Sequence, residues 1–199
     1  MRESARSNDR QDPMPLIHLV EGPVGAGKST YAAALATRLG GVHIALDEWF
    51  ATLFSPDRPD TDAMAWYVVR KERLAGHIWT HAHALIASGV VPILELGLIQ
   101  QASRRSFYDQ VRAAGIELEV VVLEASREVR WERVARRNIE KGPTFAMVVP
   151  DAIFDLASDM WQSPDAVEIE EQHIEVISTD RPGRDGQGIR YGRSAATRG

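Results

Sequence analysis

The run Gly22-Pro23-Val24-Gly25-Ala26-Gly27-Lys28-Ser29-Thr30 constrains the fold of this chain more than any other stretch. It matches G-x-x-x-x-G-K-[ST], the phosphate-binding loop known as Walker A. Residues 16–20 are apolar and predict a buried strand, and residues 31–39 predict a helix that ends at two glycines. The pattern requires this order of strand, glycine loop and helix. We therefore predict that residues 22–30 bind a nucleoside triphosphate.

The residue types in the loop indicate how it would bind that ligand. Glycines let the backbone approach a polyphosphate, and the N–H groups together with the positive end of the following helix attract it. Lys28 is expected to reach the β- and γ-phosphates, and the Ser29 hydroxyl is expected to hold Mg²⁺, which prefers hard oxygen ligands. No N-K-x-D pattern for guanine is present, so the predicted cofactors are ATP and Mg²⁺.

Composition limits the class of protein. A length of 199 residues, with 44% hydrophobic and 26% charged residues, suits one α/β domain. The net charge of −5 argues against a general nucleic-acid binder, and the absence of cysteine excludes disulfides and thiolate metal sites. No apolar run is long enough to span a membrane, and no signal-peptide core is present, so we expect no membrane partner and a cytoplasmic location.

Strands and helices are predicted to alternate between two polar ends. Residues 1–15 are expected to form a mobile tail and residues 181–199 a disordered one, leaving residues 16–180 as a single domain. Further strands are predicted at 42–46, 90–96, 116–123 and 174–177, and further helices at 62–88, 103–114, 126–140 and 151–161. Ser103 is the predicted cap of its helix. Such alternation predicts a parallel sheet covered on both faces, with ligands beyond the carboxyl ends of the strands.

Two carboxylates follow predicted strands and so are expected near the phosphate loop. Phosphoryl transfer needs one group to orient or deprotonate the attacking hydroxyl and another to support Mg²⁺. Asp47 is the candidate for the first role, and Glu95, acting through a water, is the candidate for the second. The alternatives are that Asp47 caps a helix or is a surface charge, and that Glu95 is an ordinary charge at the end of a strand.

A different class of protein remains open. Residues 42–48 look like the apolar strand followed by Asp-Glu of a mechanical ATPase, with Glu48 polarising water. This pattern follows the phosphate loop in what should be the very next strand, and the chain lacks the length for a separate helical lid domain. A regulatory or hydrolytic ATPase without an acceptor is therefore the second hypothesis.

Arginines are concentrated on one predicted helix: Arg127, Arg130, Arg133, Arg136 and Arg137. Arg130, Arg133 and Arg137 share one face by their spacing. Arginines that close over a transferring phosphoryl group lower the barrier, so we predict a closing lid at about residues 130–150. The alternative is a solvated face, on which Arg136 pairs with Glu132.

Apolar and aromatic residues gather after Asp47 and predict either core packing or an acceptor pocket: Trp49, Phe50, Leu53, Phe54, Met64, Trp66 and Tyr67. Asp57, Arg70 and Arg73 would be the polar groups of such a pocket. We predict a small acceptor that carries a hydroxyl. A nucleoside or nucleotide stays open because Arg70 and Arg73 could bind a phosphate, whereas a polynucleotide would need a basic track with stacking aromatics.

Several of these stretches together resemble a known family: the phosphate loop, Leu46-Asp47-Glu48-Trp49, Leu53-Phe54-Ser55-Pro56-Asp57, and Arg133 through Asn138. They look like the bacterial AAA-family ATP-binding proteins of P-loop kinase type, a group similar to chloramphenicol phosphotransferase, zeta toxins and the kinase domain of polynucleotide kinase. The resemblance covers residues 16–177. It implies a P-loop NTPase fold with a five-stranded parallel sheet in the order 2-3-1-4-5.

The same resemblance implies roles for individual residues. It assigns Asp47 to the acceptor hydroxyl, and it places a lid near Arg133 and Arg137, which with Lys28 would be the catalytic residues. The third strand of the family often ends in Asp-x-Gly. Here Glu95-Leu96-Gly97 stands in that place, so the Mg²⁺ role of Glu95 departs from the family pattern.

Overall fold

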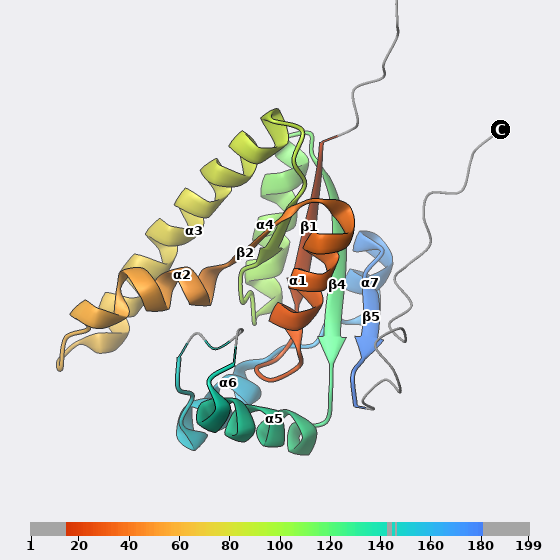
Figure 1. Cartoon of the computed structure of the whole chain (residues 1–199). Helices are drawn as coiled ribbons and strands as arrows, with labels where there is room; N and C mark the ends of the chain where they lie inside the picture. The colour runs from red at the N-terminus through yellow and green to blue at the C-terminus, as the bar shows by residue number, and fades with distance from the viewer. Residues whose placement is uncertain (1–14, 143–144, 146, 181–199) are drawn as a thin grey trace, which may run out of the picture.

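The five strands form one parallel sheet in the order β2-β3-β1-β4-β5, which confirms the predicted fold class and strand order (Figure 1). The computed structural model describes residues 15–142, 145 and 147–180. The strands are β1 (Leu16–Glu21), β2 (Val42–Ala45), β3 (Pro92–Glu95), β4 (Glu117–Glu124) and β5 (Glu175–Ser178). β1 pairs with β4 along its whole length, from Leu16 opposite Glu117 to Glu21 opposite Val122.

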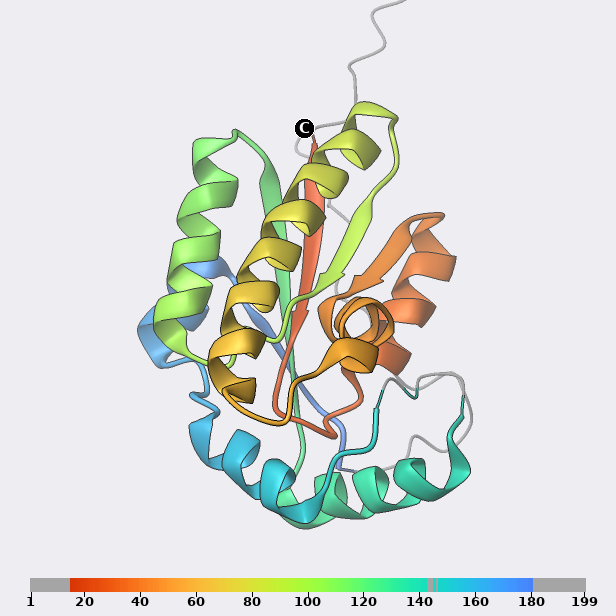
Figure 2. The same ribbon diagram turned by 90° about the vertical axis from the view of Figure 1, so that its left-hand side faces the viewer.

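Helices cover both faces of the sheet and its carboxyl edge. They are α1 (Lys28–Leu39), α2 (Leu46–Leu53), α3 (Ala63–Ala87), α4 (Gln101–Ala113), α5 (Arg127–Glu140), α6 (Asp151–Met160) and α7 (Ala166–Gln172), with a 3₁₀ turn at Ser55–Asp57. Figure 2 shows α3 and α4 on one face of the sheet and α5 and α6 running beneath its carboxyl edge. Within the part of the chain that the structure describes, no helix is both long and apolar enough to cross a membrane.

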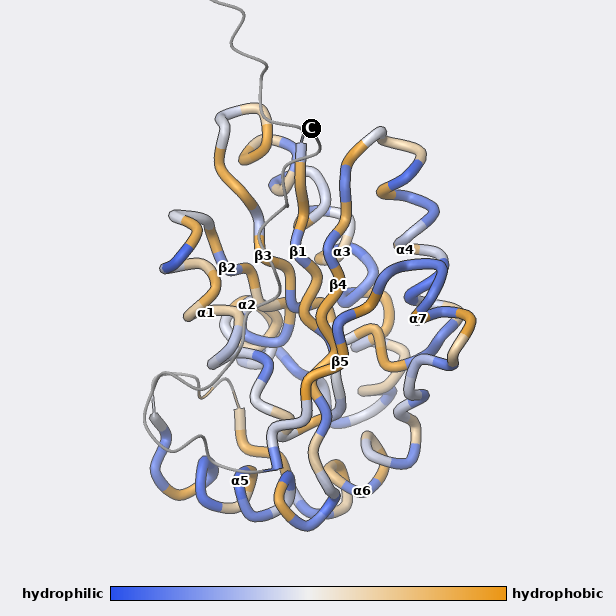
Figure 3. The backbone as a smooth tube through the Cα atoms, turned by 90° about the vertical axis from the view of Figure 1, so that its right-hand side faces the viewer, coloured by the Kyte–Doolittle hydropathy of each residue, from blue (hydrophilic) through white to orange (hydrophobic). Residues whose placement is uncertain are grey.

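The core has two apolar layers because the side chains of each strand alternate between the faces of the sheet. Ile17 and Leu19 of β1 pack into the layer under α3 and α4, whereas Val20 packs into the layer under α1. The strands are accordingly hydrophobic along most of their length (Figure 3). This alternation directs the side chain of Glu21, the last residue of β1, towards the face covered by α3 and α4.

Two predictions about element boundaries are wrong. The second strand ends at Ala45, and Leu46 already begins α2, which was not predicted; Ala45 is the N-cap and makes no side-chain bond, so no capping residue marks the start. Ser103 does not cap α4, which begins at Gln101. The N–H of Gln101 instead donates to Gln162 Oε1 (2.9 Å), a residue far along the chain.

The predicted tails lie almost entirely outside the described residues. Pro15 is the exception, and its carbonyl oxygen accepts a hydrogen bond from the N–H of Glu117 (2.8 Å). The first residue of β4 is therefore bonded to a residue that the sequence assigned to the N-terminal tail.

A buried ionic network joins α4 to α7. Arg104 Nε and Nη2 donate to the two carboxylate oxygens of Glu168 (2.6 and 2.9 Å), and the Tyr108 hydroxyl donates to the same carboxylate (3.0 Å). The side chains of Arg104 and Glu168 are 0% and 1% exposed. A fully hydrogen-bonded pair of this kind is costly to break, since removing one partner leaves a buried charge.

We predict that Glu168→Gln lowers the free energy of unfolding by about 3 kcal/mol, because Arg104 then stays buried without a counter-charge. The neighbouring pair between Arg105 and Glu171 also joins α4 to α7, but its side chains are 47% and 54% exposed. Glu171→Gln is therefore the matched control and should leave the stability nearly unchanged. Urea unfolding of both variants measures the difference. Equal losses of unfolding free energy would contradict the inference that the buried pair stabilises the fold more than the exposed pair does.

Candidate active site

The phosphate loop has the backbone geometry that anion binding needs. A Cβ added at Gly22 (φ 147°) would lie 2.3 Å from the carbonyl oxygen of Leu123, so only glycine lets the loop pack against β4. Gly27 (φ 98°) is the N-cap of α1 and has no atom within 4 Å of an added Cβ. The first turn of α1 has no acidic residue and no side-chain cap, so its N–H groups are available to a phosphate.

The carbonyl groups of the loop are held by side chains from three parts of the chain. Lys28 Nζ donates to Pro23 (3.2 Å), Arg130 Nη1 to Val24 (3.0 Å) and Thr179 Oγ1 to Ala26 (3.0 Å). Bonded carbonyl oxygens are kept away from the space where negative charge must bind. The arrangement therefore favours an anion over the loop and also places the Lys28 ammonium across it.

Ser29 and Glu95, the predicted magnesium ligands, lie together. Ser29 Oγ donates to Glu95 Oε1 (3.2 Å), and His43 Nε2 hydrogen-bonds Glu95 Oε2 (3.2 Å). Burial acts to raise the pKa of Glu95, but the His43 hydrogen bond, the Lys28 charge and the Ser29 hydroxyl outweigh it and lower the pKa. Glu95 is thus an ionised carboxylate beside a hydroxyl.

This pair of oxygen ligands suits Mg²⁺, which keeps several waters and takes its remaining ligands from carboxylates and phosphates. Among the described residues, no cluster of three or more His, Asp or Glu side chains could form a cage for a metal ion. An ion at Ser29 and Glu95 would consequently need phosphate oxygens and water to complete its coordination.

Asp47 lies in the first turn of α2 and is exposed. It is not the N-cap, because Ala45 occupies that position. The charge of Asp47 acts on groups of two other helices. Burial and, to a lesser extent, the Asp47 charge raise the pKa of Tyr67 on α3 to about 12. Asp47 also favours the charged form of Arg137 on α5. The carboxylate is therefore accessible to an incoming molecule, and its charge acts on groups of both α3 and α5.

Arg137 carries a buried Nε that has no hydrogen-bond partner. Burial lowers the pKa of its guanidinium, while the charges of Asp47 and Glu95 act in the opposite direction. A buried polar atom without a partner is uncommon in native proteins, and a bound group often explains it. An anion above the phosphate loop would supply the missing acceptor.

Three other arginines of α5 bind protein groups, whereas Arg136 is exposed. Arg133 donates to the side-chain oxygen (3.0 Å) and the carbonyl oxygen (2.5 Å) of Thr179, and Arg127 pairs with Asp155 and Asp159 of α6. Arg130 is buried and binds the loop. The prediction that Arg130, Arg133 and Arg137 share one face fits their burial, but Arg133 is directed at Thr179 rather than at Asp47 and Glu95.

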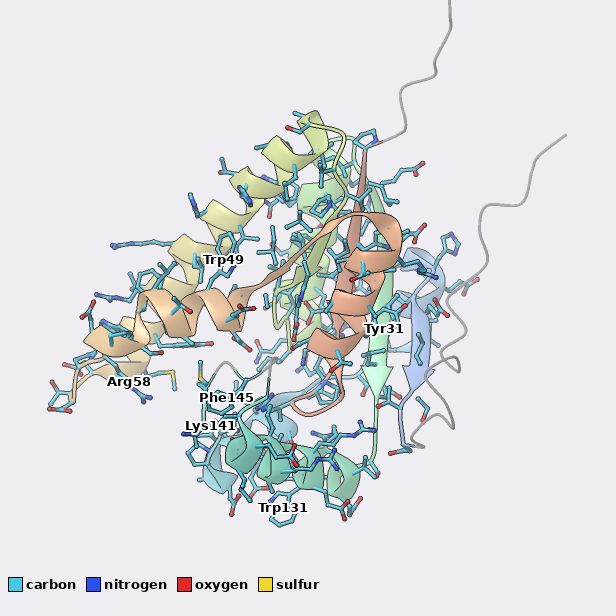
Figure 4. The ribbon with its side chains drawn as sticks, viewed as in Figure 1. Tyr31, Trp49, Arg58, Trp131, Lys141 and Phe145 are labelled. Carbon is cyan, nitrogen blue, oxygen red and sulfur yellow. The ribbon has the colours of Figure 1, made fainter. Side chains whose placement is uncertain are left out.

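The end of α5 is tied to the residues that follow it. Asn138 donates to the carbonyl oxygen of Val149 (2.8 Å) and accepts from its N–H (3.1 Å). Phe145 lies on the side of α5 towards α2, and Trp131 lies on the opposite side (Figure 4). Residues 143, 144 and 146 of the predicted lid are outside the described part.

The aromatic cluster between α2 and α3 is partly core and partly open. Phe50 is 4% exposed and packs against Phe54, Trp66 and Tyr67, with ring centroids 4.8–5.7 Å apart. Arg70 stacks over the Trp66 ring at 4.4 Å. Exposed residues at the rim include Leu53, Asp57, Met64 and Arg73. The inner part of the cluster is thus core packing, and an acceptor pocket at its exposed rim stays a prediction.

The sequence did not single out Glu21, His43 or Thr179. Glu21 is completely buried, accepts a hydrogen bond from the N–H of Leu98 (2.9 Å) at Oε2, and has no partner at Oε1. A carboxylate at the end of an apolar strand, directly before the loop, was a visible signal. His43 and Thr179 gave none, since their contacts with Glu95 and Ala26 arise only in the folded chain.

The comparisons with known proteins agree with this geometry. A family model described as an AAA domain matches residues 17–158. No curated protein matches the chain in sequence. Kti12 from Chaetomium thermophilum, in complex with ADP-AlF3, is similar in structure with a TM-score of 0.60 and 16% identity, over 85% of this chain and 92% of that chain.

Two small-molecule kinases have similar structures. The gluconokinase from Sinorhizobium meliloti 1021 has a TM-score of 0.52 and 20% identity, over 87% of this chain and 86% of that chain. The shikimate kinase from Acinetobacter baumannii, in complex with shikimate, has a TM-score of 0.55 and 23% identity, over 86% and 87%. These likenesses confirm the fold that the sequence implied. Because the family model spans most of the ordered domain, the chain belongs to the AAA domain family, with the fold of the P-loop kinases.

Proposed function

We propose that this protein is a kinase that uses ATP and Mg²⁺ to phosphorylate a hydroxyl group of a small molecule. The observation that carries the proposal is the unpartnered Nε of Arg137, which feels the charges of both Asp47 and Glu95 beside a complete phosphate loop. A cation that interacts electrostatically with both the candidate base and the candidate metal ligand suits a site where a phosphoryl group is transferred.

Each residue would then have a defined part in the transfer. Lys28 and the N–H groups of the loop bind the β- and γ-phosphates, and Ser29 with Glu95, through a water, would hold Mg²⁺, which neutralises phosphate charge. Asp47 orients the acceptor hydroxyl and accepts its proton. Arg137 stabilises the charge on the transferring group. Arg133 contributes indirectly, since it holds Thr179, which in turn bonds Ala26 of the loop.

A compact acceptor fits the surroundings of Asp47 best. The rim between α2 and α3 combines exposed apolar side chains with a few polar ones, and the net charge of −5 disfavours a polynucleotide. The structural relatives named for gluconate and shikimate act on small hydroxylated acids by their names. A nucleoside or nucleotide remains the second acceptor class, because Arg73 is exposed on α3.

The alternative class is an ATPase without an acceptor. Glu48 is exposed in the first turn of α2. The name of Kti12, a structural relative, does not mention a phosphate acceptor. The two hypotheses differ in one measurable respect. A kinase consumes ATP faster when its acceptor is present, and a switch or hydrolase does not. A cytoplasmic location stays a prediction that rests on the need for ATP.

The decisive experiment follows phosphate from labelled ATP into three sets of acceptors: hydroxylated acids, sugars and antibiotics; nucleosides and nucleotides; and 5′-hydroxyl oligonucleotides. We expect labelling of a member of the first set, with Lys28→Ala as the inactive control because it loses the charge-assisted contact to the phosphates. Labelling of oligonucleotides alone, with binding that weakens steeply as salt rises, would refute the small-molecule acceptor. Hydrolysis of ATP at the same rate with every acceptor would favour the ATPase.

Asp47→Asn should lower kcat by about 10²–10⁴, because the amide keeps the size of the side chain but cannot accept the proton. ATP binding should stay nearly intact, since Asp47 contacts no loop residue in the structure described. Glu48→Gln, the adjacent exposed carboxylate on the same turn, is the matched control and should retain turnover. A collapse of ATP affinity in Asp47→Asn would instead assign Asp47 to Mg²⁺ or to folding.

Arg137→Ala should lower kcat by roughly 10²-fold while changing the ATP dissociation constant much less, because its charge acts mainly in the transition state. Arg136→Ala removes the exposed arginine next to it and serves as the control. Steady-state kinetics with an ATP-binding assay separate the two effects. Equal losses in kcat and in ATP affinity would make Arg137 a simple binding residue.

A further inference from the structure

Glu21 is a completely buried carboxylic acid that the proposed reaction does not yet use. Its side chain lies on the face of the sheet covered by α3 and α4, as does that of Leu19 two residues earlier. The phosphate loop begins at the next residue. Glu21 therefore lies where the phosphate loop begins, on the face of the sheet that α3 covers. Tyr67 of α3, which the charge of Asp47 affects, is on this side of the sheet as well.

Groups from several neighbouring elements hydrogen-bond Glu21 or shift its pKa. The N–H of Leu98 binds Oε2 (2.9 Å), and no donor reaches Oε1. The charges that it feels come from Lys28 of α1, Lys71 of α3 and Glu95 of β3, and it in turn affects Arg104 and Tyr108 of α4. Within the described residues, Glu21 Oε1 and Arg137 Nε are the buried side-chain polar atoms without a partner.

The protonation state of Glu21 suits a hydrogen bond in either direction. Burial raises the pKa of Glu21 to about 7, and Lys28, the Leu98 N–H and Lys71 only partly offset that effect. Near neutral pH the carboxyl group is therefore present in both forms. The neutral form can donate a hydrogen bond and the ionised form can accept one.

A single stretch of backbone separates Glu21 from the acceptor side. The connection from β3 to α4, residues 96–100, passes between the lower ends of α3 and α4 (Figure 2). It is held by the bond from Leu98 to Glu21 and by Lys71 Nζ, which donates to the carbonyl oxygen of Gly97 (3.3 Å). A Cβ added at Gly97 would meet no atom within 4 Å, so the outer side of this connection is open.

We propose that Glu21 belongs to the acceptor site, where its free oxygen hydrogen-bonds a second hydroxyl of the acceptor, one that is not phosphorylated. The proposal rests on the proposed kinase function and narrows the substrate class to small molecules with at least two hydroxyl groups. Because Glu21 is completely buried, the acceptor would reach Oε1 when residues 96–100 move outward. Asp47 handles the hydroxyl that receives the phosphate, and Glu21 selects the molecule that carries it.

The test pairs the variant Glu21→Met with altered acceptors, because methionine is of similar size but has no group that hydrogen-bonds a hydroxyl strongly. The best acceptor of the panel and its monodeoxy analogues are compared by kcat/KM at saturating ATP. For wild type, removal of the hydroxyl that Glu21 binds should cost roughly 10-fold or more, whereas for Glu21→Met the same removal should cost much less. Glu21→Asp keeps the charge but withdraws the carboxyl group, and should lose the same discrimination.

Glu119→Gln is the matched control. This glutamate on β4 is 65% exposed and pairs with His18, so the variant should discriminate among the analogues as wild type does. Equal losses in wild type and Glu21→Met for every analogue would overturn the assignment of Glu21 and leave the kinase function standing. A wild-type protein that labels no member of the panel would overturn the kinase function and, with it, this inference.

A second readout checks the ionisation of Glu21 without any acceptor. The folded-state pKa is above the unfolded value, so the folded state holds more protons and its stability falls as the pH rises from about 4.5 to 7. Glu21→Gln removes that loss. The melting temperature of Glu21→Gln minus that of wild type should therefore increase by roughly 5 °C or more between pH 5 and pH 8. A difference that is constant with pH would show that Oε1 already has a partner and would overturn the proposal.

Discussion

The active site depends on the bonds that hold the carbonyl groups of the phosphate loop. Lys28, Arg130 and Thr179 each donate to one of these carbonyl oxygens. Because a carbonyl oxygen repels a phosphate, fixing it against protein donors is as necessary as exposing the N–H groups. The donors come from α1, α5 and the residue after β5, so the loop takes this form only when distant parts of the chain are already assembled.

The sequence was sufficient for the fold wherever local chemistry decides the structure. The apolar runs and the glycine-terminated helices predicted the alternation, and the family resemblance implied the strand order that the sheet has. Errors occurred where an element boundary is set by a distant partner, as at Gln101, whose N–H is capped by Gln162. The short helix α7 was missed although Asp165 caps it by accepting from the N–H of Glu168 (2.8 Å), a signal that the sequence does contain.

Candidate site residues could be predicted where a sequence motif or the end of a strand marks them. Ser29 lies in the phosphate loop and Glu95 ends β3, and the two side chains are hydrogen-bonded, while their role as magnesium ligands stays a prediction. Helix spacing alone placed Arg133 and Arg137 on one face. It cannot say which of them already donates hydrogen bonds to other groups of the protein. Thr179 occupies Arg133, whereas Arg137 keeps a free nitrogen. That distinction requires the three-dimensional contacts.

The anchoring of α5 limits which parts of the molecule can respond to an acceptor. Arg130 and Arg133 tie the first half of this helix to the phosphate loop, directly and through Thr179. A swing of the whole helix would break the bonds that shape the loop, so movement must come from residues after Arg137 or from the opposite side, where α2, α3 and residues 96–100 meet. That side carries the exposed rim of the aromatic cluster. Because Arg130 and Thr179 bind the loop from outside this rim, substitutions in the rim would leave their bonds to the loop intact, which is how one phosphate loop could be combined with different binding sites on the same fold.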